Sequence, residues 1–405
     1  MNGKQLLVAT ISSGLSFTAC TKNVLTENTS SESSKKATNQ INSVADLTIN
    51  TGMTLAQINQ VIGASNLGDT VWVEAGTYNI TGRINMKAGI ILAKKTSANP
   101  IFDATGTTAQ LLAFSYGSDL SNTTFSGITF WNIRFVINGS SKTTFKYCIF
   151  DYGVRKAGTD ENYYSDAYVQ FNNSDLPLIN NCVFSRRVNH SGRGVWIGSG
   201  TTNSKITNCT FGNGGTTGYF VTGINDNSQS NSLIDGNTIN RNTALDNDLL
   251  QTDHGIYAHS FNGVTINNNT ISGWPTNADG GAIKARNGQN ITISNNTLNN
   301  SGILLYEYDN TPAYPYLDYV KVLNNQINIA VPSSGIYHGI GYYRNNAIGS
   351  EYSIRIEGNI LPNGTISFNG ANLNVSNFNA AGGGIFNNDY GMIDLKAGIN
   401  QSGNY

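Results

Sequence analysis

Two short stretches of the sequence carry side chains that could perform acid–base chemistry. The stretches are Asp253-His254-Gly255-Ile256-Tyr257-Ala258-His259 and Gly280-Gly281-Ala282-Ile283-Lys284-Ala285-Arg286. Alignment of their isoleucines places Tyr257 beside Lys284. The same alignment places His259 beside Arg286. Side chains alternate inward and outward along a strand, so neighbouring strands of a stacked repeat would present these four polar side chains on one outer face. The sequence therefore predicts a compact polar patch.

These residue types would suit β-elimination from a uronic-acid polymer. That reaction needs a neutralised carboxylate, a base for the adjacent ring proton and an acid for the leaving oxygen. The forked donors of Arg286 match a carboxylate. A lysine close to an arginine can have a lowered pKa, which would make Lys284 a usable base. Tyr257 can donate or accept a proton, and His259 can position or neutralise a group.

Other candidate binding residues surround the patch. Alignment of Val195 with the two isoleucines places Trp196 two coils before Tyr257, with Asn225 and Asn227 on the coil between. Tyr306 falls one coil after Lys284. The further candidates are His190, Arg193 and His254, with Tyr168 and Tyr308 as accompanying aromatics. Cations beside flat rings suit an acidic polysaccharide, and the alternative is a solvated face with scattered charges.

Composition predicts the kind of scaffold that carries the patch. The chain has 405 residues, of which 12% are charged, with 44 Gly and 7 Pro. Long amphipathic helical stretches are nearly absent, which favours an elongated all-β protein with many tight turns. The formal net charge of -1 gives no overall attraction to nucleic acid or to a membrane.

A repeat of variable length becomes recognisable from about residue 125. Its segments are FSGITF, FKYCIF, INNCVF, ITNCTF, IDGNTI, INNNTI, ISNNTL, LNNQI and IEGNIL. Similar segments separated by loops of different lengths indicate a solenoid with insertions. One position of the repeat is occupied in turn by Ile128, Cys148, Cys182, Cys209, Asn237, Asn269, Asn296, Asn325 and Asn359. We expect the asparagines to form a ladder of amides and the cysteines to be small buried residues rather than a disulfide or a metal site.

The N-terminal part is predicted to be a targeting segment and a tether. Residues 1–20 combine Lys4, a short apolar run and Thr18-Ala19-Cys20, which resembles the end of a bacterial lipobox. An ordinary signal peptide is the alternative. Polar residues 21–45 are expected to be a flexible tether, and residues 46–405 a single β-helix domain. We expect an exported outer-membrane lipoprotein, periplasmic or at the cell surface. It would be monomeric and attached to the membrane only through its lipid.

The folded part is predicted to begin with a helix over 54–62, followed over 68–78 by a turn, a short strand and another turn. The tail from about 376 is expected to cover the other end. This cap, the asparagine ladder and the segments GGAIKARNGQNITISNN and SGILLYEY together resemble right-handed β-helix polysaccharide lyases. The resemblance is strongest to alginate lyases of polysaccharide lyase family 31 and weaker to family 6. It covers about residues 50 to 375.

The resemblance implies a poly(mannuronate/guluronate) lyase with alginate as its partner and substrate. It implies Lys284 as base and Tyr257 as acid, or the reverse, with Arg286 and His259 binding the carboxylate. Family 6 relatives carry the Lys and the Arg on separate coils and often hold calcium, whereas here both stand on one strand. No acidic cluster is recognisable around the patch, although Glu307 is close in sequence. No cofactor is therefore predicted, and a calcium site is left open.

Two other functions are compatible with the same repeat. A β-helix glycoside hydrolase would need paired carboxylates, for which Asp246, Asp248, Asp253 and Asp279 are candidates, although turn formation explains them as well. A non-catalytic carbohydrate-binding surface protein would have no need of Lys284.

Overall fold

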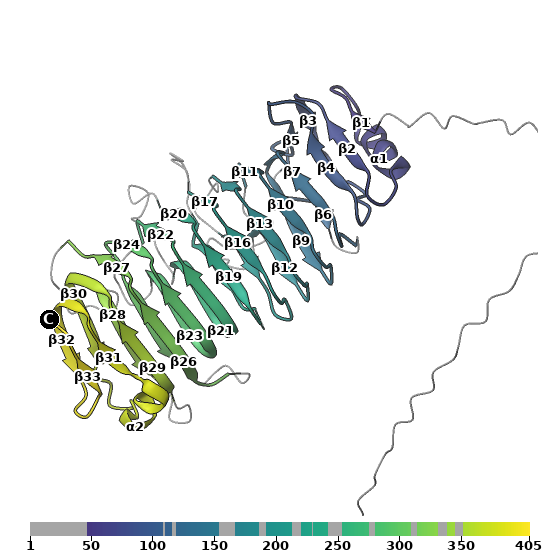
Figure 1. The fold of residues 1–405 in the computed structure, drawn as a ribbon. Helices are drawn as coiled ribbons and strands as arrows, with labels where there is room; N and C mark the ends of the chain where they lie inside the picture. The colour runs from purple at the N-terminus through teal and green to yellow at the C-terminus, as the bar shows by residue number, and fades with distance from the viewer. Residues whose placement is uncertain are drawn as a thin grey trace, which may run out of the picture. The chain divides into compact units, whose positions relative to one another are not determined.

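A computed structural model describes most of the chain from residue 47 onward. The described ranges are 47–107, 110–115, 119–153, 167–185, 192–212, 220–228, 230–241, 253–274, 280–308, 314–330, 338–344 and 351–405. The strand pairings within these ranges are parallel, and they stack short strands coil upon coil (Figure 1). The predicted all-β parallel solenoid is confirmed.

The strands form three parallel stacks, one for each side of the coil. The first sheet contains β6 (Leu111–Ser115), β9 (Ile133–Asn138), β12 (Ala167–Asn172), β15 (Arg193–Ile197), β18 (Thr222–Asp226), the first parts of β21 (Asp253–Asn267) and β23 (Gly280–Ser294), β25 (Ile303–Glu307), β28 (Gly339–Arg344), and the ends of β30 (Ile360–Phe368) and β32 (Asp389–Leu395).

The second sheet contains β1 (Thr48–Ile49), β2 (Thr70–Val73), β4 (Ile91–Lys94), β7 (Thr124–Ser126), β10 (Thr144–Lys146), β13 (Leu178–Asn180), β16 (Lys205–Thr207), β19 (Ser232–Asp235), the second parts of β21 and β23, β26 (Leu317–Leu323), β29 (Tyr352–Glu357), β31 (Gly384–Phe386) and β33 (Gln401–Ser402).

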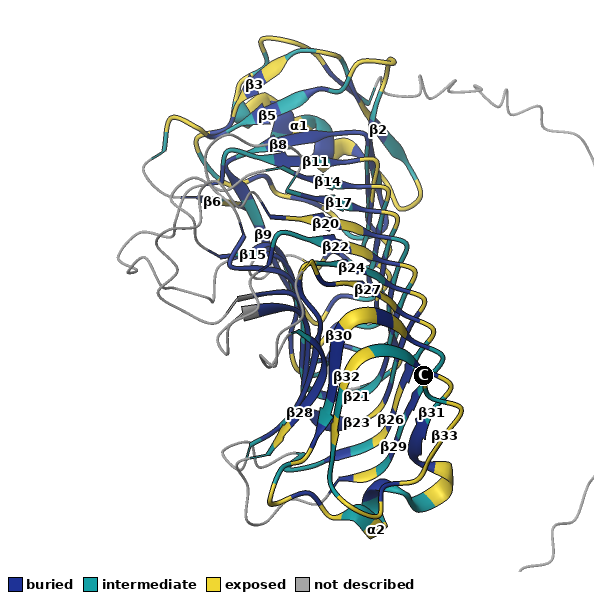
Figure 2. Cartoon of the chain, turned by 90° about the vertical axis from the view of Figure 1, so that its left-hand side faces the viewer, coloured by how far each residue is buried: buried dark blue, intermediate teal, exposed yellow. Residues whose placement is uncertain are grey.

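The third sheet contains β3 (Thr77–Asn79), β5 (Ile101–Asp103), β8 (Thr129–Trp131), β11 (Ile149–Asp151), β14 (Val183–Phe184), β17 (Thr210–Phe211), β20 (Thr238–Asn240), β22 (Thr270–Ser272), β24 (Thr297–Asn299), β27 (Gln326–Asn328) and the starts of β30 and β32. Figure 2 shows that strands of the first sheet, such as β15 and β28, lie on a different side of the coils from β26 and β29 of the second.

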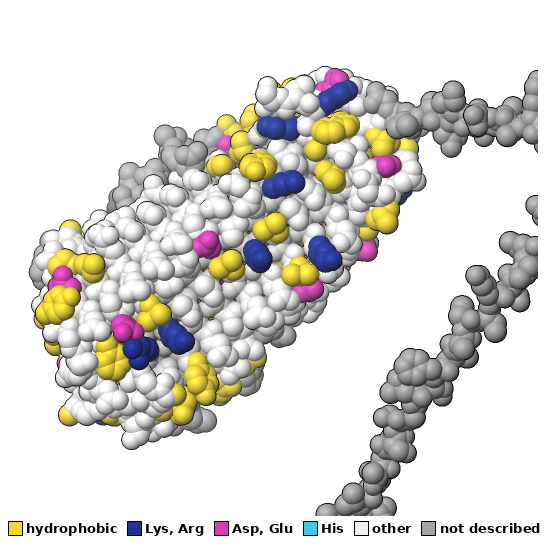
Figure 3. Space-filling model, in the orientation of Figure 1, with side chains coloured by type: hydrophobic (Ala, Val, Ile, Leu, Met, Phe, Trp, Pro, Cys, Tyr) yellow, Lys and Arg dark blue, Asp and Glu magenta, His cyan; other side chains and the backbone are white. Residues whose placement is uncertain are grey.

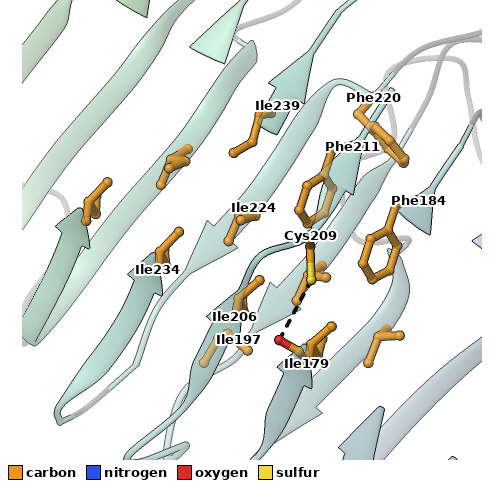
Figure 4. Packing of buried hydrophobic residues seen from close by; sticks show 14 of the residues in the cluster. Ile179, Phe184, Ile197, Ile206, Cys209, Phe211, Phe220, Ile224, Ile234 and Ile239 are labelled. Atoms are coloured by element: carbon orange, nitrogen blue, oxygen red, sulfur yellow. Dashed lines mark hydrogen bonds between the residues drawn. The ribbon is translucent and has the colours of Figure 1, made fainter. Parts of the chain in front are cut away.

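The core is a set of apolar columns that run along the solenoid. Phe150, Phe184 and Phe211 stack ring on ring, with centroids 4.7 and 4.6 Å apart, and Ile239 continues the column (Figure 4). Neighbouring coils are about 4.8 Å apart, which is close to the separation of stacked aromatic rings. A repeated inward residue therefore packs directly on its counterpart in the next coil.

The predicted asparagine ladder is confirmed. Asn269 donates through Nδ2 to Oδ1 of Asn296 at 3.0 Å, and Asn296 donates in the same way to Asn325 at 2.9 Å. Each amide also serves the backbone, since the main-chain N–H of Asn269 donates to Asn296 Oδ1 at 2.9 Å. The ladder satisfies buried turn groups at every coil that it crosses.

The cysteines continue this ladder as predicted. The backbone N–H of Cys182 donates to Sγ of Cys209 at 3.4 Å, and the backbone N–H of Cys209 donates to Oδ1 of Asn237 at 2.9 Å. The thiol of Cys209 lies against the carbonyl of Ile179 (Figure 4). Cys148, Cys182 and Cys209 are buried free thiols, so the small-residue interpretation is confirmed.

Replacement of Asn296 by alanine should destabilise the solenoid by about 3 kcal/mol. The change removes the acceptor of two N–H groups of Asn269 and the donor to the carbonyl of Ile266, all of them buried. A buried polar group left without a partner costs about 1–3 kcal/mol. Urea unfolding followed by circular dichroism measures the loss. Asn295→Gly is the matched control, because Asn295 has a φ of 55° and its exposed side chain donates one hydrogen bond, to Asn267. An equal loss in the control would contradict the ladder's role.

The two ends of the solenoid differ in how well they were predicted. The expected first helix is α1 (Leu55–Ala64), where Thr54 accepts from the backbone of Gln57 in a capping box. The expected strand after it is β2. The tail, by contrast, extends the solenoid instead of only covering it. After α2 (Val375–Phe378) and the 3₁₀ turn η2 (Ala380–Gly382), β31 to β33 add parallel strands, and Asn388 and Asn404 continue the ladder.

Within the described ranges, no helix has the length and apolarity needed to cross a membrane.

Candidate functional site

The predicted patch forms on the first sheet, where β21 and β23 lie side by side. Tyr257 pairs with Lys284 and His259 pairs with Arg286, as the sequence alignment predicts. Tyr257, His259 and Arg286 are half-buried, and Lys284 is 7% exposed. We call these four residues the polar square.

Glycines on β18 and β21 let the backbone lie close to the third sheet just before the buried isoleucines. Gly223 and Gly255 each precede an isoleucine whose side chain is buried in the core. A Cβ at Gly255 would lie 2.5 Å from the side chain of Ile271, and one at Gly223 would lie 2.8 Å from that of Ile239. Side chains of the third sheet fill this space, so the backbone approaches them closely where it has no side chain of its own. The buried isoleucine that follows fixes the outward direction of the residue after it, because side chains alternate along a strand.

Arg286 connects the two strands of the polar square. Its Nη1 donates to the hydroxyl oxygen of Tyr257 at 3.3 Å. Lys284 Nζ lies 4.6 Å from the centre of the Tyr306 ring and 5.8 Å from that of Tyr257. Arg286 also lies against the Tyr306 ring, with its guanidinium carbon 5.5 Å from the centre. Both cations are thus held near an aromatic face, which stabilises them.

The amide of Asn227 fixes the orientation of His259. Asn227 Oδ1 accepts from Trp196 Nε1 at 3.3 Å and from Asn225 Nδ2 at 2.8 Å. The indole N–H is only a donor, so the Nδ2 of Asn227 faces His259 Nδ1, at 3.4 Å. His259 Nδ1 is then the acceptor, and the proton of the neutral ring lies on Nε2. The sequence placed Asn225 and Asn227 here but gave no sign of this role.

Burial and neighbouring cations keep both histidines neutral. Burial lowers the pKa of His259 to about 4, and Arg286, Lys284 and Arg193 add to the effect. Burial and Lys284 also hold the pKa of His254 well below its usual value. His259 can therefore donate a hydrogen bond at neutral pH but cannot neutralise a carboxylate by its own charge.

His254 lies behind the polar square. It is fully buried, with its ring centre 4.9 Å from that of Tyr257. Tyr257 also stacks on His259 at 5.4 Å, with the planes 7° apart. In this position His254 packs against the Tyr257 ring and supports it. That His254 contacts a substrate stays a prediction.

The hydroxyl of Tyr257 is protonated at neutral pH. Burial raises its pKa above the ordinary 10.0, although Arg286 and Arg193 act in the opposite direction. The same balance of burial against Arg286 raises the pKa of Tyr306. Tyr257 thus rests as a proton donor whose oxygen already accepts a hydrogen bond from a cation.

Aromatic residues extend the site along the solenoid in both directions. Tyr306 pairs with Arg286, as expected, and its ring stacks with Tyr308 at 5.9 Å and with Tyr343 at 5.4 Å. On the other side, the guanidinium of Arg193 lies 4.4 Å from the centre of the Trp196 ring. The polar square therefore stands between two aromatic surfaces, each with an arginine against it: Arg193 against Trp196, and Arg286 4.7 Å from the centre of the Tyr308 ring.

Tyr168 does not belong to this surface. It is fully buried, and its ring packs between Phe150 and Phe220 at 5.8 and 6.2 Å. Its hydroxyl accepts from the backbone N–H of Gly153 at 2.7 Å. The expectation that Tyr168 accompanies the basic residues is wrong, because its side chain enters the core.

A buried charge cluster lies next to Tyr306 and was not recognised in the sequence. Glu307 and Glu351 are fully buried, and each has a carboxyl oxygen within hydrogen-bond distance, 3.0 Å, of the hydroxyl oxygen of Tyr342. Arg344 joins them, with Nε 3.3 Å from Glu307 and Nη1 2.9 Å from Glu351. Glu307 also accepts from the backbone N–H of Leu317 at 2.8 Å. The expectation of no acidic cluster near the patch is therefore incomplete.

Two carboxyl groups share one arginine in this cluster, so one of them titrates at an unusual pH. Burial, followed by the charge of Glu351, raises the pKa of Glu307 to about 7. The cluster fixes the end of β25 beside Tyr306 and the start of β26. It is a structural support of the site, and its carboxylates are not exposed to a ligand.

Replacement of Glu307 by glutamine should make the protein's stability less dependent on pH between 4.5 and about 7. In that window the folded protein keeps a proton that the unfolded chain releases, so the free energy of unfolding falls as the pH rises. The shift corresponds to about 3 kcal/mol. Asp318, whose pKa burial raises to about 6, contributes in the same direction and remains in the variant. Urea unfolding at pH 5 and pH 8 measures the difference.

Glu357→Gln is the control for this prediction. Glu357 bonds to Arg355, which lowers its pKa, so its contribution to stability is lost only below pH 4.5. If the pH dependence of stability is unchanged in Glu307→Gln, the proton that the folded protein keeps in this pH window is not bound to Glu307.

Several predicted residues lie outside the described part of the chain. They are His190, Asp246, Asp248 and Asp279. Asp253 begins β21. Within the described ranges, no group of three or more His, Cys, Asp or Glu residues could hold a metal ion.

Comparisons with known proteins agree on the fold. A surface adhesin of Streptococcus pneumoniae, PfbA, superposes with a TM-score of 0.53 and 14% identity, covering 86% of this chain and 89% of the adhesin. The catalytic domain of a GH87 α-1,3-glucanase superposes with a TM-score of 0.51 and 14% identity, and the match covers 88% of this chain and 68% of the glucanase domain. A mannuronic acid specific polysaccharide family 6 lyase from human gut microbiota has a TM-score of 0.48 and 13% identity. The match covers 86% of this chain and 82% of the lyase.

At these identities the likeness extends to the fold alone. No curated protein matches the sequence. The family described as the right-handed β-helix region matches residues 119–327, just over half of the chain, and this range contains the polar square. The chain belongs to the right-handed β-helix family.

Proposed function

We propose that the protein is a polysaccharide lyase that cleaves a uronic-acid polymer, alginate in the first instance, by β-elimination. One observation carries the proposal: Lys284 stands beside Tyr257 on neighbouring strands, and Arg286 donates to the hydroxyl of Tyr257 at 3.3 Å. This arrangement brings together a base, an acid and a carboxylate-binding cation within two coils. The resemblance of GGAIKARNGQNITISNN and SGILLYEY to family 31 alginate lyases supports the same reaction.

The geometry suits a division of roles between the two proton-transferring residues. Lys284 removes the ring proton next to the carboxylate, the bond to the leaving oxygen breaks, and a carbon–carbon double bond forms. Tyr257, protonated at neutral pH because burial raises its pKa, delivers its proton to the leaving oxygen. Arg286 binds the carboxylate through its fork of N–H donors, and the neutral His259 donates from Nε2.

Tyrosine and tryptophan rings on either side of the polar square suit the sugar units next to the one that reacts. Trp196 lies two coils before Tyr257, and Tyr306 one coil after Lys284. Rings of this kind stack on the apolar faces of sugars while nearby cations bind the carboxylates. A chain of sugars running along the solenoid axis would meet all of these groups in turn.

Ultraviolet absorbance during digestion tests the proposal. Only a lyase creates an unsaturated uronide with a conjugated carboxylate, so absorbance should rise together with new reducing ends. Alginate, its two block types, chondroitin and pectate should be compared. Reducing ends without absorbance would show a glycoside hydrolase, and binding without either product would show a carbohydrate-binding protein.

A further inference from the structure

The second sheet carries an aromatic group far from the polar square in the coil. On β26 and β29, the rings of Tyr319 and Tyr352 meet edge to face with centroids 5.4 Å apart. They are 47% and 36% exposed. Tyrosine rings are common at binding surfaces, because the ring is apolar and the hydroxyl is polar.

The surrounding face makes this pair distinctive. Going back along the solenoid, the outward residues at matching positions are uncharged: Gln289 and Asn262 precede Asp318, and Thr292 and Thr265 precede Lys321. Figure 3 views this face, on which hydrophobic, basic and acidic side chains lie among mostly uncharged polar ones. The aromatic pair thus follows two coils whose matching positions carry uncharged polar residues.

Tyr319 also breaks the local backbone rule of the repeat. Its φ is 53°, in the left-handed region, where the matching residues of the two preceding coils are Asn290 and Gly263. Asparagine and glycine tolerate that conformation, whereas tyrosine is held there at a cost of about 1–3 kcal/mol. Asparagine would occupy this turn with less strain, as Asn290 does one coil earlier.

A cation completes the group. Lys321 is exposed, and no described residue forms a hydrogen bond or an ion pair with it. The neighbouring Arg355 is occupied: it bonds to Glu357 at 2.7 Å and to the carbonyl of Gly382 at 2.9 Å. Burial, and then the charge of Glu351, raises the pKa of Asp318 to about 6, so this half-buried carboxyl is mostly ionised at neutral pH. Asp318, Arg355 and Glu357 are half-buried, and Lys321 is the exposed charge of the group.

We propose that Tyr319, Tyr352 and Lys321 form a second, non-catalytic binding surface for an acidic polysaccharide. The two rings receive sugar faces and the ammonium receives a carboxylate or a sulfate. The inference rests on the proposed function only for the acidic character of the polymer. Because this surface lies on a different sheet from the polar square, it can hold one part of a long chain, or a second chain, while the square acts on another (Figure 2).

Native electrophoresis in gels containing alginate tests this surface by itself. All variants are made in a parent protein that carries Lys284→Met and Arg286→Met. In this parent the polar square has lost both cations, and the polymer stays uncut. We expect alginate to retard the parent. The triple change Tyr319→Asn, Tyr352→Ser and Lys321→Thr should raise the apparent Kd about tenfold, equivalent to about 1.4 kcal/mol. The asparagine and threonine are the residues found one coil earlier, so the thermal midpoint should not fall.

Tyr147→Asn is the matched control. Tyr147 is 56% exposed with a φ of 57°, and Asn181 holds the matching turn position one coil later. Equal retardation of the parent and the triple variant would overturn the proposal, as would no retardation of the parent, an equal loss in Tyr147→Asn, or equal retardation by a neutral glucan. Because none of these measurements requires cleavage, a failure here is distinct from failure of the lyase proposal.

Discussion

Replacement of Lys284 by methionine should reduce lyase turnover by about a thousandfold, equivalent to about 4 kcal/mol in the barrier. Methionine keeps the length and the apolar stem of the side chain and removes the amine. The stem packs among buried residues of the first sheet, so the solenoid should unfold at the same temperature as the native protein. Initial rates of absorbance increase on alginate measure the effect.

The polymer should still bind to Lys284→Met, because Arg286, Trp196 and Tyr306 remain. Binding and turnover are therefore measured separately. Lys205→Met is the control, since Lys205 is exposed on β16 of the second sheet and is far along the coil from the polar square. Unchanged turnover in Lys284→Met would remove this residue from the mechanism and would favour the non-catalytic alternative.

The register of the site could be predicted because the repeat contains an internal reference. Ile256 and Ile283 are buried and unambiguous, and a strand has a period of two, so one inward residue fixes the direction of its neighbours. The repeated asparagines marked where each coil enters the third sheet, so they showed how the successive coils align. These two periodic signals were sufficient for the pairing of Tyr257 with Lys284 and for the position of Tyr306.

The same reasoning could not find the contacts that depend on loops. Glu307 and Glu351 are separated in sequence by segments of irregular length, and nothing periodic relates them. Their shared Arg344 brings together residues of β25, β28 and the segment before β29 only when the coils are closed. The amide of Asn227 is a similar case, since its effect on His259 depends on which of its two ends accepts from Trp196.

Tyr168 shows where the period-of-two argument fails. It stands immediately before the buried Val169, at the place in the coil that Gly194, Gly223 and Gly255 occupy later. Two successive residues face the core at this place, so alternation is broken there. In the later coils this place holds glycine and then, on β23, Ala282, whereas the earlier coil has room for a ring against Phe150.

Replacement of Tyr257 by phenylalanine should reduce the turnover number by about a hundredfold to a thousandfold with little change in KM. The ring keeps its stacking on His259 and its contact with His254, while the hydroxyl that Arg286 binds at 3.3 Å is removed. Loss of an acid acting only in the transition state lowers kcat and leaves ground-state binding intact. Arg286→Lys should do the reverse, mainly raising KM, because it weakens the fork that binds the carboxylate.

The pH dependence separates a proton donor from a structural tyrosine. Activity of the native protein requires protonated Tyr257, so it should fall at alkaline pH, around or above the ordinary pKa of 10.0, since burial raises the pKa of this hydroxyl. The residual activity of Tyr257→Phe should lack that fall. His259, with a pKa of about 4, should produce no inflection between pH 6 and 7. If the alkaline fall persists in Tyr257→Phe, the proton comes from another group, and the acid must be sought elsewhere on the polar square.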